Sequence, residues 1–490
     1  MKFIPRPYQK LIVEHILKTP RCACWCGMGM GKTSSTLYAL NLLQQVDGVG
    51  RALVLAPLRV AVSTWPDEVD KWEDFKGMRV SVIAGSKSDR KKALRKDADI
   101  YCMSYENVPW LVDELNGAWP FDVIVADEST RIKSFRRHSG GSRAKALGQV
   151  AWRSRHFIEL TGTPASNGLL DLWGQFWFLD KGERLGRSMR QYQEVYFTPI
   201  RVGANAFAVK YKPRDFAEKA ILEKTKDLTL KLNAEDWFDI KKPIVFDVTV
   251  RLPKPIENLY HQMERNLYAE LGDIALETAN AATKTSVCLQ MASGFVYASE
   301  GLAPEFSAFD DEPERSVGCD IRNPLAPKPY HQLHREKIEA LREILGEVNG
   351  HPVLIAYQFK HECAELLATF KGARVLDKNP QTIRDWNARR IPMLLAHPAS
   401  CGHGLSLQDG GNVLIFYSTG WNLEEHEQII ERIGPTRQMQ AGHNRPVYVY
   451  NIIARDTLDE VVQERIKTKR DILDLLMEKK RNDEAVRTNE

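Results

Sequence analysis

The run Gly29-Met30-Gly31-Lys32-Thr33 constrains the fold of this chain more than any other segment. It follows an apolar stretch at residues 22–26 and precedes a helix predicted to begin near Ser34. Glycines allow consecutive backbone N–H groups to converge on a phosphate, and the N-terminus of a helix adds a favourable dipole. Lys32 would reach the β and γ phosphate oxygens, and Thr33 would bind Mg²⁺. The segment therefore predicts a strand, a phosphate loop and a helix in series.

A phosphate loop needs a metal-ordering acid on a neighbouring strand, and the apolar run 123–126 ends in Asp127 and Glu128. Asp127 would position Mg²⁺, and Glu128 would orient or deprotonate an attacking water. Phosphoryl transfer also needs positive charge at the transition state, for which Arg432 and Arg437 are candidates. Each arginine could instead be a surface residue or a DNA contact.

Short β-branched runs alternate with helical stretches, which is the pattern of parallel sheets covered by helices. Three runs precede residue 165 and four follow residue 350, namely 52–56, 123–126, 157–160, 353–357, 393–396, 413–417 and 447–453. The pattern predicts an α/β fold with two lobes. The predicted domains are lobe one at 1–240 with a helical protrusion at about 180–240, a helical insertion and linker at 241–330, and lobe two with a C-terminal helix at 331–490.

Composition excludes some classes of protein and leaves others open. No stretch approaches the roughly 18 to 20 uninterrupted apolar residues of a membrane span, and the N-terminus lacks the apolar region of a secretory signal. We therefore expect no membrane partner and a cytoplasmic location, in a bacterial or phage-infected cell. The net charge of +4 is too small to indicate nucleic-acid binding by itself.

Further motifs surround the phosphate loop and the acidic pair. In the first half they are Arg6-Pro7-Tyr8-Gln9, residues 53–57 followed by Trp65 and Trp72, residues 101–106, residues 127–133, and residues 160–164 followed by Asn167, Leu172 and Trp173. In the second half they are residues 354–359, residues 402–407, Trp421-Asn422 and residues 428–432. In their order and spacing, over nearly the whole chain, these motifs resemble the SWI/SNF-like family of superfamily-two helicase-related DNA translocases.

The resemblance implies two RecA-like lobes with parallel sheets and helical insertions, ATP and Mg²⁺ as ligands, and double-stranded DNA as the track. Single-stranded DNA is a further candidate partner. The nucleotide-binding residues that it implies are Gln9, Met28, Gly29, Met30, Gly31, Lys32, Thr33, Ser34 and Gly404. The implied DNA contacts are Pro57, Arg59, Arg131, Lys133, Thr161, Gly162 and Ser400. The implied metal ligands are Thr33 and Asp127.

Three positions depart from the family pattern. Thr130 stands where the family has a histidine that couples the nucleotide site to the other lobe, so coupling could run through Thr130 or Ser129. Ala399 stands where motif five often has arginine. Pro435 stands at the second arginine of motif six, which leaves Arg437 two positions late.

Three functions remain open at this point. The first is a DNA-stimulated ATPase that translocates on duplex DNA. The second is a strand-separating helicase of phage or bacterial replication, recombination or repair, which a fork-splitting hairpin or a stacking aromatic residue would favour. The third is a non-catalytic DNA-binding scaffold, against which Lys32, Asp127, Glu128 and Arg432 argue.

Little sequence flanks the motifs, so we expect a compact phage or bacterial motor. Such a motor would be a monomer that works with a protein partner such as a nuclease or replication factor. The basic residues of the predicted protrusion could extend the DNA track, or could keep an exposed insertion soluble.

Overall fold

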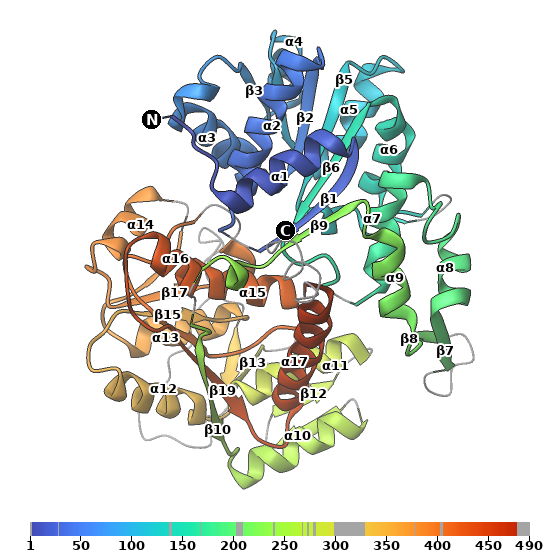
Figure 1. The fold of residues 1–490 in the computed structure, drawn as a ribbon. Coiled ribbons are helices and arrows are strands. Elements are labelled where there is room, and N and C mark those ends of the chain that lie inside the picture. Colours follow the sequence, from blue (N-terminus) through green and yellow to red (C-terminus); the bar gives the residue numbers. More distant parts are fainter. Residues whose placement is uncertain are drawn as a thin grey trace, which may run out of the picture. The chain divides into compact units, whose positions relative to one another are not determined.

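The computed structural model describes residues 2–27, 29–136, 140–166, 168–201, 209–238, 241–266, 268–271, 274–277, 281–297, 329–377, 379–401 and 405–477. The chain divides into two compact units. Unit one comprises residues 1–240 and 469–490, and unit two comprises residues 241–468. Each unit contains one large parallel sheet with helices on both faces, which confirms the predicted α/β fold with two RecA-like lobes (Figure 1).

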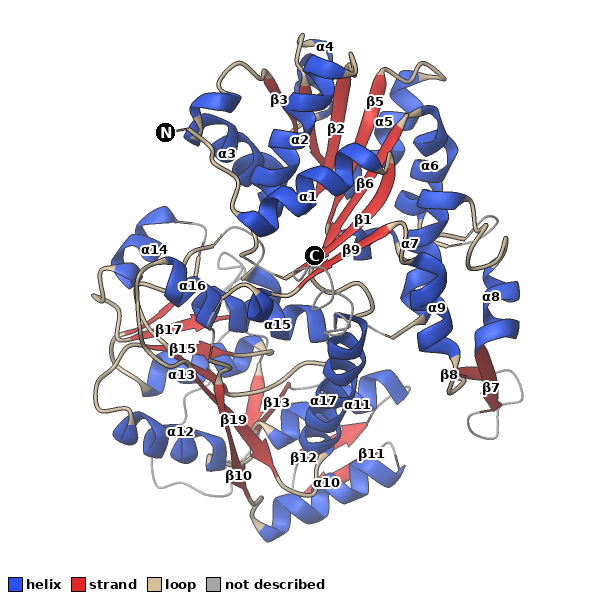
Figure 2. Ribbon diagram, viewed as in Figure 1, coloured by secondary structure: helices blue, strands red, loops and turns tan. Residues whose placement is uncertain are grey.

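The sheet of unit one has seven strands, and all of its neighbouring pairs are parallel. In spatial order they are β3 (Val80–Ile83), β4 (Ile100–Ser104), β2 (Arg51–Ala56), β5 (Phe121–Asp127), β6 (His156–Thr161), β1 (Arg21–Cys26) and β9 (Thr229–Leu232) (Figure 2). The central strands are buried almost throughout, as expected where helices cover both faces. Because the strands are parallel, their carboxyl ends meet at one edge of the sheet.

Helices cover the two faces of this sheet. On one face lie α1 (Pro7–Lys18), α2 (Lys32–Val46) and α3 (Trp65–Lys71), which share an apolar core with β1 and its neighbours. On the other face lie α5 (Val108–Leu115), α6 (Ser142–Val150) and α7 (Leu170–Asp180). Trp25 of β1 packs edge-on against Phe176 of α7 on this second face.

The sheet of unit two has six parallel strands. Their spatial order is β10 (Ile244–Val250), β19 (Tyr448–Ala454), β18 (Val413–Phe416), β15 (Val353–Ala356), β17 (Met393–Ala396) and β16 (Ala373–Val375). One face packs against α12 (Glu336–Glu347) and α13 (Lys360–Thr369), and the other against α14 (Pro380–Asn387), α15 (Leu423–Ile433) and α16 (Pro435–Gln440). A smaller cluster joins α10 (Lys254–Asn266), α11 (Ala281–Ala292) and the start of α17 (Leu458–Met477).

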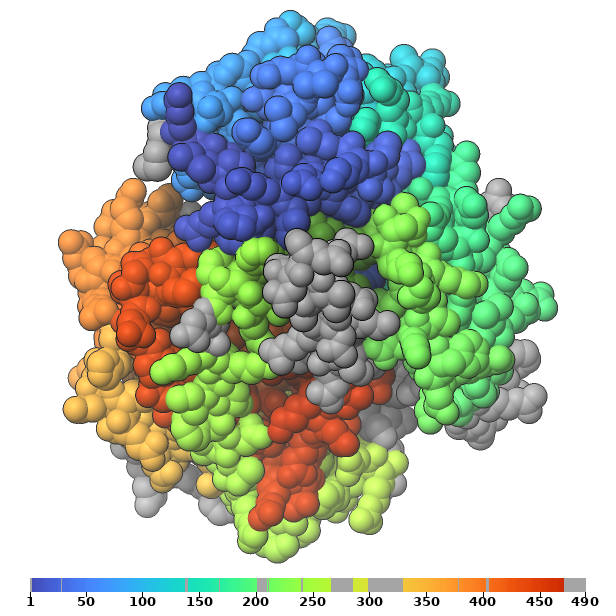
Figure 3. Space-filling view, in the orientation of Figure 1, coloured from blue at the N-terminus to red at the C-terminus, as the bar shows by residue number. Residues whose placement is uncertain are grey.

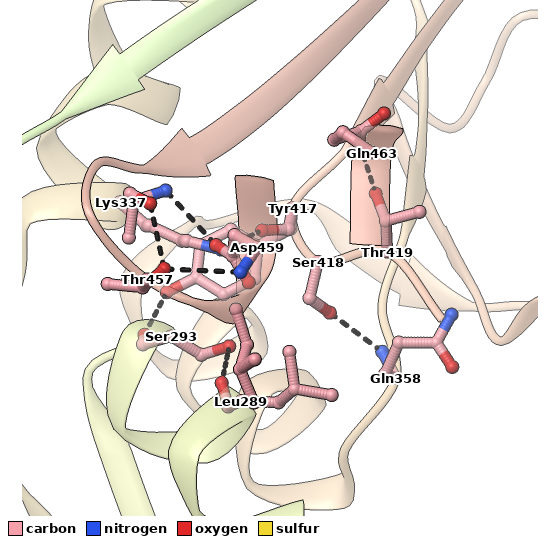
Figure 4. A network of polar contacts seen from close by, with 12 residues as sticks. Leu289, Ser293, Lys337, Gln358, Tyr417, Ser418, Thr419, Thr457, Asp459 and Gln463 are labelled. Carbon is pink, nitrogen blue, oxygen red and sulfur yellow. Dashed lines mark hydrogen bonds and ion pairs between the residues drawn. The ribbon is translucent and has the colours of Figure 1, made fainter. Parts of the chain in front are cut away.

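A network of buried polar contacts ties α12, β18 and α17 together in unit two (Figure 4). The Lys337 ammonium forms an ion pair of 2.5 Å with Asp459, and it also donates to the carbonyl of Tyr417 at 3.2 Å. The Tyr417 hydroxyl donates in turn to the carbonyl of Ser293. Because the Lys337 side chain is 0% exposed, Asp459 and the Tyr417 carbonyl take the place of water around its ammonium group.

The structure differs from the sequence pattern in the middle of the chain. The pattern predicts a helical protrusion and then a helical insertion from residue 241, whereas the structure contains strands in both. Residues 229–232 and 244–250 form β9 and β10, which are edge strands of the two sheets. The run at β10 is rich in β-branched residues, and apolar and polar residues alternate from Phe246 to Val250, which is a strand pattern that the prediction of a helical insertion missed.

Two further strands, β7 (Phe197–Arg201) and β8 (Val209–Pro213), form an antiparallel hairpin between α8 (Met189–Tyr196) and α9 (Ala217–Thr225). Figure 1 shows this hairpin extending from unit one, beyond the ends of α8 and α9. Among the residues that the structure describes, none of the helices is both long enough and apolar enough to span a bilayer.

Candidate active site

The phosphate loop connects the buried strand β1 to the first turn of α2. Gly29 and Gly31 adopt φ values of 76° and 67°, which place both in the left-handed region that favours glycine. Gly31 is also the residue at which α2 is capped, so the free N–H groups of the helix point into the loop. A Cβ added at Gly31 would collide with the amide of Gln9. Met28 lies outside the described residues.

Lys32 and the residues after it fold back onto the loop. The Lys32 ammonium donates to the carbonyls of Cys26 at 2.8 Å and Gly27 at 3.3 Å. The hydroxyls of Ser34 and Ser35 donate to the carbonyl of Gly31. The loop therefore holds a partly exposed lysine among neutral oxygens, which phosphate oxygens could replace.

Gln9 reaches the same loop from α1. Pro7 begins this helix, and the Gln9 side chain accepts a hydrogen bond of 2.9 Å from the N–H of Arg6. Gln9 is only 7% exposed, although α1 lies at the surface of unit one (Figure 3). Its amide is thereby fixed beside Gly31, which agrees with the position of Gln9 among the nucleotide-binding residues that the family resemblance implies.

The acidic pair lies where β5 ends. Asp127 is the last residue of the strand, and Glu128 follows it with φ of 63°, a left-handed conformation that few residues other than glycine adopt. The Trp65 indole donates to Asp127 Oδ2 at 2.9 Å, and the Tyr105 hydroxyl donates to the Asp127 carbonyl at 3.0 Å. The side-chain carboxylate and the backbone carbonyl of Asp127 therefore each accept a hydrogen bond from an aromatic residue.

Burial, and to a smaller extent the nearby charge of Glu128, raise the pKa of Asp127 to about 6. The indole hydrogen bond from Trp65 and the positive charge of Lys32 act in the opposite direction. Lys32 is thus close enough to Asp127 to favour its ionised form. The strand order places β1 and β5 on either side of β6, which brings the loop and the acid to one edge.

Two threonine hydroxyls orient the carboxylate of Glu128. Thr161 donates to Glu128 Oε1 at 2.7 Å, and Thr130 donates to the same oxygen at 3.3 Å. The sequence assigns Thr161 to DNA, but its side chain is fully buried in the structure and is directed at the acid. Thr130, which replaces the family's histidine, also contacts the acid. Thr161 therefore belongs with the catalytic candidates rather than with the DNA-facing surface.

Of the other predicted DNA contacts in unit one, four follow the carboxyl ends of strands. Pro57 and Arg59 follow β2, Arg131 follows β5, and Gly162 follows β6. Arg59 and Arg131 are exposed, and Pro57 and Gly162 are partly exposed.

Lys133 is different from these residues, because its ammonium pairs with Asp171 at 3.1 Å and donates to Ser166 at 3.0 Å. In this structure Lys133 ties the segment after β5 to α7, so it is not a free surface cation.

The predicted arginines lie in unit two, on consecutive helices. Arg432 of α15 is 1% exposed and donates to the carbonyl of Leu405 at 3.4 Å. Arg437 of α16 donates to the hydroxyl of Ser406 at 3.4 Å, and burial lowers its pKa. Both guanidinium groups therefore contact residues of the motif at 402–407.

Two more predicted residues belong to this unit. The hydroxyl of Ser400 donates to the carbonyl of His397 at 2.7 Å, and the residue is exposed. Gly404 lies outside the described residues.

Sequence reasoning did not identify the partners of the acidic pair. Trp65 and Tyr105 occur in predicted motifs, but nothing in their spacing shows that they contact Asp127. Ser129 donates to Gln175 of α7 at 2.7 Å, and Gln175 donates to the carbonyl of Pro164. These contacts join residues that are 11 to 62 positions apart, so only the folded sheet reveals them.

A phosphate loop and an acidic pair at the same edge of a parallel sheet are typical of P-loop proteins with RecA-like lobes. The model of the SNF2-related domain matches residues 25–287, which is more than half of the chain. The chain therefore belongs to the SNF2-related family.

Individual relatives and one solved structure are also similar to this chain. The chain is 49% identical over 479 residues to protein p41 of Acyrthosiphon pisum secondary endosymbiont phage 1, covering 97% of this chain and 98% of that protein. It is 21% identical to an uncharacterized ATP-dependent helicase of Mycoplasma genitalium, where the match covers 89% of this chain but only 38% of the relative. The solved Sulfolobus solfataricus SWI2/SNF2 ATPase core in complex with dsDNA is 19% identical, covers 96% of this chain and 92% of its own, and has a TM-score of 0.42.

Proposed function

We propose that this chain hydrolyses ATP and uses the free energy to move along double-stranded DNA. The observation that carries the proposal is the arrangement in unit one. Lys32 extends from a loop in which Gly29 and Gly31 have positive φ values, and its charge favours the ionised form of Asp127, while Glu128 is oriented by two hydroxyls. This combination supports a site for binding the phosphates and activating water.

The residues around the loop fit a Mg²⁺–ATP complex. Thr33 is the second residue of α2, and Thr33 and Asp127 are each partly exposed as residues. These two residues would hold Mg²⁺, which would neutralise phosphate charge when bound. Gln9 would contact the base, and Lys32 the β and γ phosphates. Of the two arginines, Arg437 is the better candidate for stabilising the transition state, because Arg432 is almost fully buried within unit two.

Duplex DNA is the proposed track because the exposed segments at the strand ends suit backbone contacts. Arg59 and Arg131 would pair with phosphates, and the backbone around Pro57 and Gly162 would contribute N–H donors. Such contacts do not read sequence, and they weaken as salt increases.

Triplex displacement tests the translocase directly. Wild-type protein with ATP should release a third strand annealed to a duplex, whereas Glu128→Gln, which keeps the phosphate loop, should not. Failure of wild-type protein to displace the third strand, while it still hydrolyses ATP on duplex, would overturn translocation but not the ATPase.

A strand-separating helicase is the second candidate, and one structural observation favours it. The β7–β8 hairpin is the kind of element that could divide a fork, and it carries Ile200 and Val209, which are 44% and 41% exposed. A forked duplex with a labelled strand discriminates the two functions. Strand release that disappears when residues 198–212 are replaced by a short turn would favour the helicase, and triplex displacement without strand release would favour the translocase.

A further inference from the structure

Trp65 lies between the proposed DNA contacts at Pro57 and Arg59 and the proposed metal ligand Asp127. Its side chain is fully buried in the core of unit one, yet its indole N–H is directed at Oδ2 of Asp127, 62 residues away in sequence. An indole has a single donor, so it fixes one carboxylate oxygen and leaves Oδ1 outside this hydrogen bond. A tryptophan that served packing alone would not need an acid as its partner.

The segment that precedes Trp65 connects it continuously to the exposed residues after β2. The N–H of Ala61 donates to the carbonyl of Pro57 at 3.0 Å, and the hydroxyl of Ser63 donates to the carbonyl of Arg59 at 2.8 Å. Residues 60–64 form a π-helix, and the N–H of Trp65 closes it on the carbonyl of Val60. Short π-helical turns are rare and occur frequently at functional sites.

Hydrogen bonds thus connect the segment from the exposed residue Arg59 to Trp65, whose indole donates to Asp127. A phosphate that pulled on Arg59 would act on the hydrogen-bonded turn of residues 57–65. Since Trp65 is packed on all sides, a shift of this turn has to move the indole relative to the end of β5. Such a shift would change the direction of the Asp127 carboxylate.

We propose that Trp65 is a positioning residue that transmits DNA contact at Pro57–Arg59 to the carboxylate of Asp127. The inference rests on the proposed function, because it assumes that Asp127 serves a bound Mg²⁺–nucleotide. Trp65 itself touches neither nucleotide nor DNA. It acts through the hydrogen bond to Asp127.

The test measures binding rather than turnover. A fluorescent ADP analogue is titrated with Mg²⁺, with and without a short DNA duplex, for wild-type protein, Trp65→Phe and Trp72→Phe. Trp72 is the matched control, because its indole donates to the carboxylate of Glu68 at 2.7 Å within the same segment and has no bond to Asp127. Both variants keep an aromatic ring and lose one indole–carboxylate hydrogen bond.

Trp65→Phe should raise the half-saturating Mg²⁺ concentration about tenfold, which is the lower end of the effect of removing an outer partner of a metal ligand. Duplex DNA should shift this concentration in wild-type protein and in Trp72→Phe, but not in Trp65→Phe. Arg59→Ala, a surface change that should not affect folding, should also abolish the shift.

Three results would overturn the inference. The first is that Trp65→Phe and Trp72→Phe have the same half-saturating Mg²⁺ concentration with and without duplex. The second is that duplex does not change this concentration in wild-type protein. The third is that duplex still changes it in Arg59→Ala. The last result counts even if Trp65→Phe does not fold. A wild-type protein that shows no Mg²⁺-dependent nucleotide binding would instead refute the proposed function, and the inference with it.

Discussion

Breaking the buried ion pair between Lys337 and Asp459 by removing one partner should strongly destabilise unit two. The two side chains are 0% and 8% exposed, and Lys337 has a second acceptor in the carbonyl of Tyr417 (Figure 4). Lys337→Met would leave the Asp459 carboxylate buried without its counter-charge, which costs about 3–5 kcal/mol. Replacing both residues, as in Lys337→Met with Asp459→Leu, removes the charge altogether and should recover most of that loss.

Urea denaturation followed by tryptophan fluorescence measures the effect. With a denaturant slope of about 2 kcal/mol per molar urea, the single variant should unfold at a midpoint lower by roughly 1.5–2.5 M. The matched control is Lys467→Met, because Lys467 pairs with Asp247 at 3.0 Å while the two side chains are 59% and 36% exposed. An exposed pair contributes about 0–1 kcal/mol, so this control should barely move the midpoint.

The reasoning would be refuted if Lys337→Met lost less than about 1 kcal/mol, since that is the range of an exposed pair. It would also be refuted if the double variant were as unstable as Lys337→Met alone. In that case the loss would come from the missing hydrogen bond to the Tyr417 carbonyl or from altered packing, and not from an uncompensated charge.

Three other perturbations follow from the geometry of unit one. Burial raises the pKa of Glu159 well above its usual value, so this residue should lower the stability by about 1.4 kcal/mol per pH unit from the unfolded pKa of about 4.3 up to the folded pKa. In thermal melts between pH 4.5 and 8, Glu159→Gln should therefore lose stability less steeply than wild-type protein as the pH rises. Equal slopes would contradict a raised pKa of Glu159. Gly31→Ala should weaken ATP binding about tenfold or more in a fluorescence titration, because φ of 67° and the amide of Gln9 both oppose a Cβ, and wild-type affinity would refute the loop geometry. Thr161→Val should lower the kcat of ATP hydrolysis about tenfold while nucleotide affinity stays constant. A general base contributes about 10²–10⁴-fold to the rate, and this substitution changes only the orientation of the base Glu128. An equal loss of nucleotide affinity would show that Thr161 acts on nucleotide binding instead.

The sequence predicts the parts of the fold that depend on local pattern. The strands at 52–56, 123–126 and 353–357 are short apolar runs in the sequence, and each forms a central strand in the structure. The phosphate loop is equally visible, because positive φ values require glycine at positions that can be read directly. Both kinds of prediction rest on interactions within a few residues.

Edge strands and the hairpin escape such prediction. An edge strand is covered on fewer sides, so most apolar residues of β10 are exposed and do not form the continuous buried run of a central strand. The β7–β8 hairpin joins two short segments, and at its base each residue pairs with a partner 16 positions away in the sequence.

The side-chain contacts of the candidate active site are likewise not predictable from local sequence. Sequence motifs name Asp127 and Glu128, but the donors that orient them come from other strands and become visible only when the parallel sheet brings them together. Thr161 illustrates the consequence, because its motif is typical of a DNA contact while its hydroxyl is buried against Glu128. Side-chain direction, and not motif identity, decides its role.

Steady-state ATP hydrolysis measured without nucleic acid and with single-stranded DNA, duplex DNA or RNA tests the central claim most directly. Lys32→Ala serves as the control, because it removes the phosphate-loop charge. The account predicts hydrolysis that duplex DNA stimulates most and that Lys32→Ala abolishes. Stimulation by single strands or RNA alone, or no hydrolysis under any of these conditions, would contradict it.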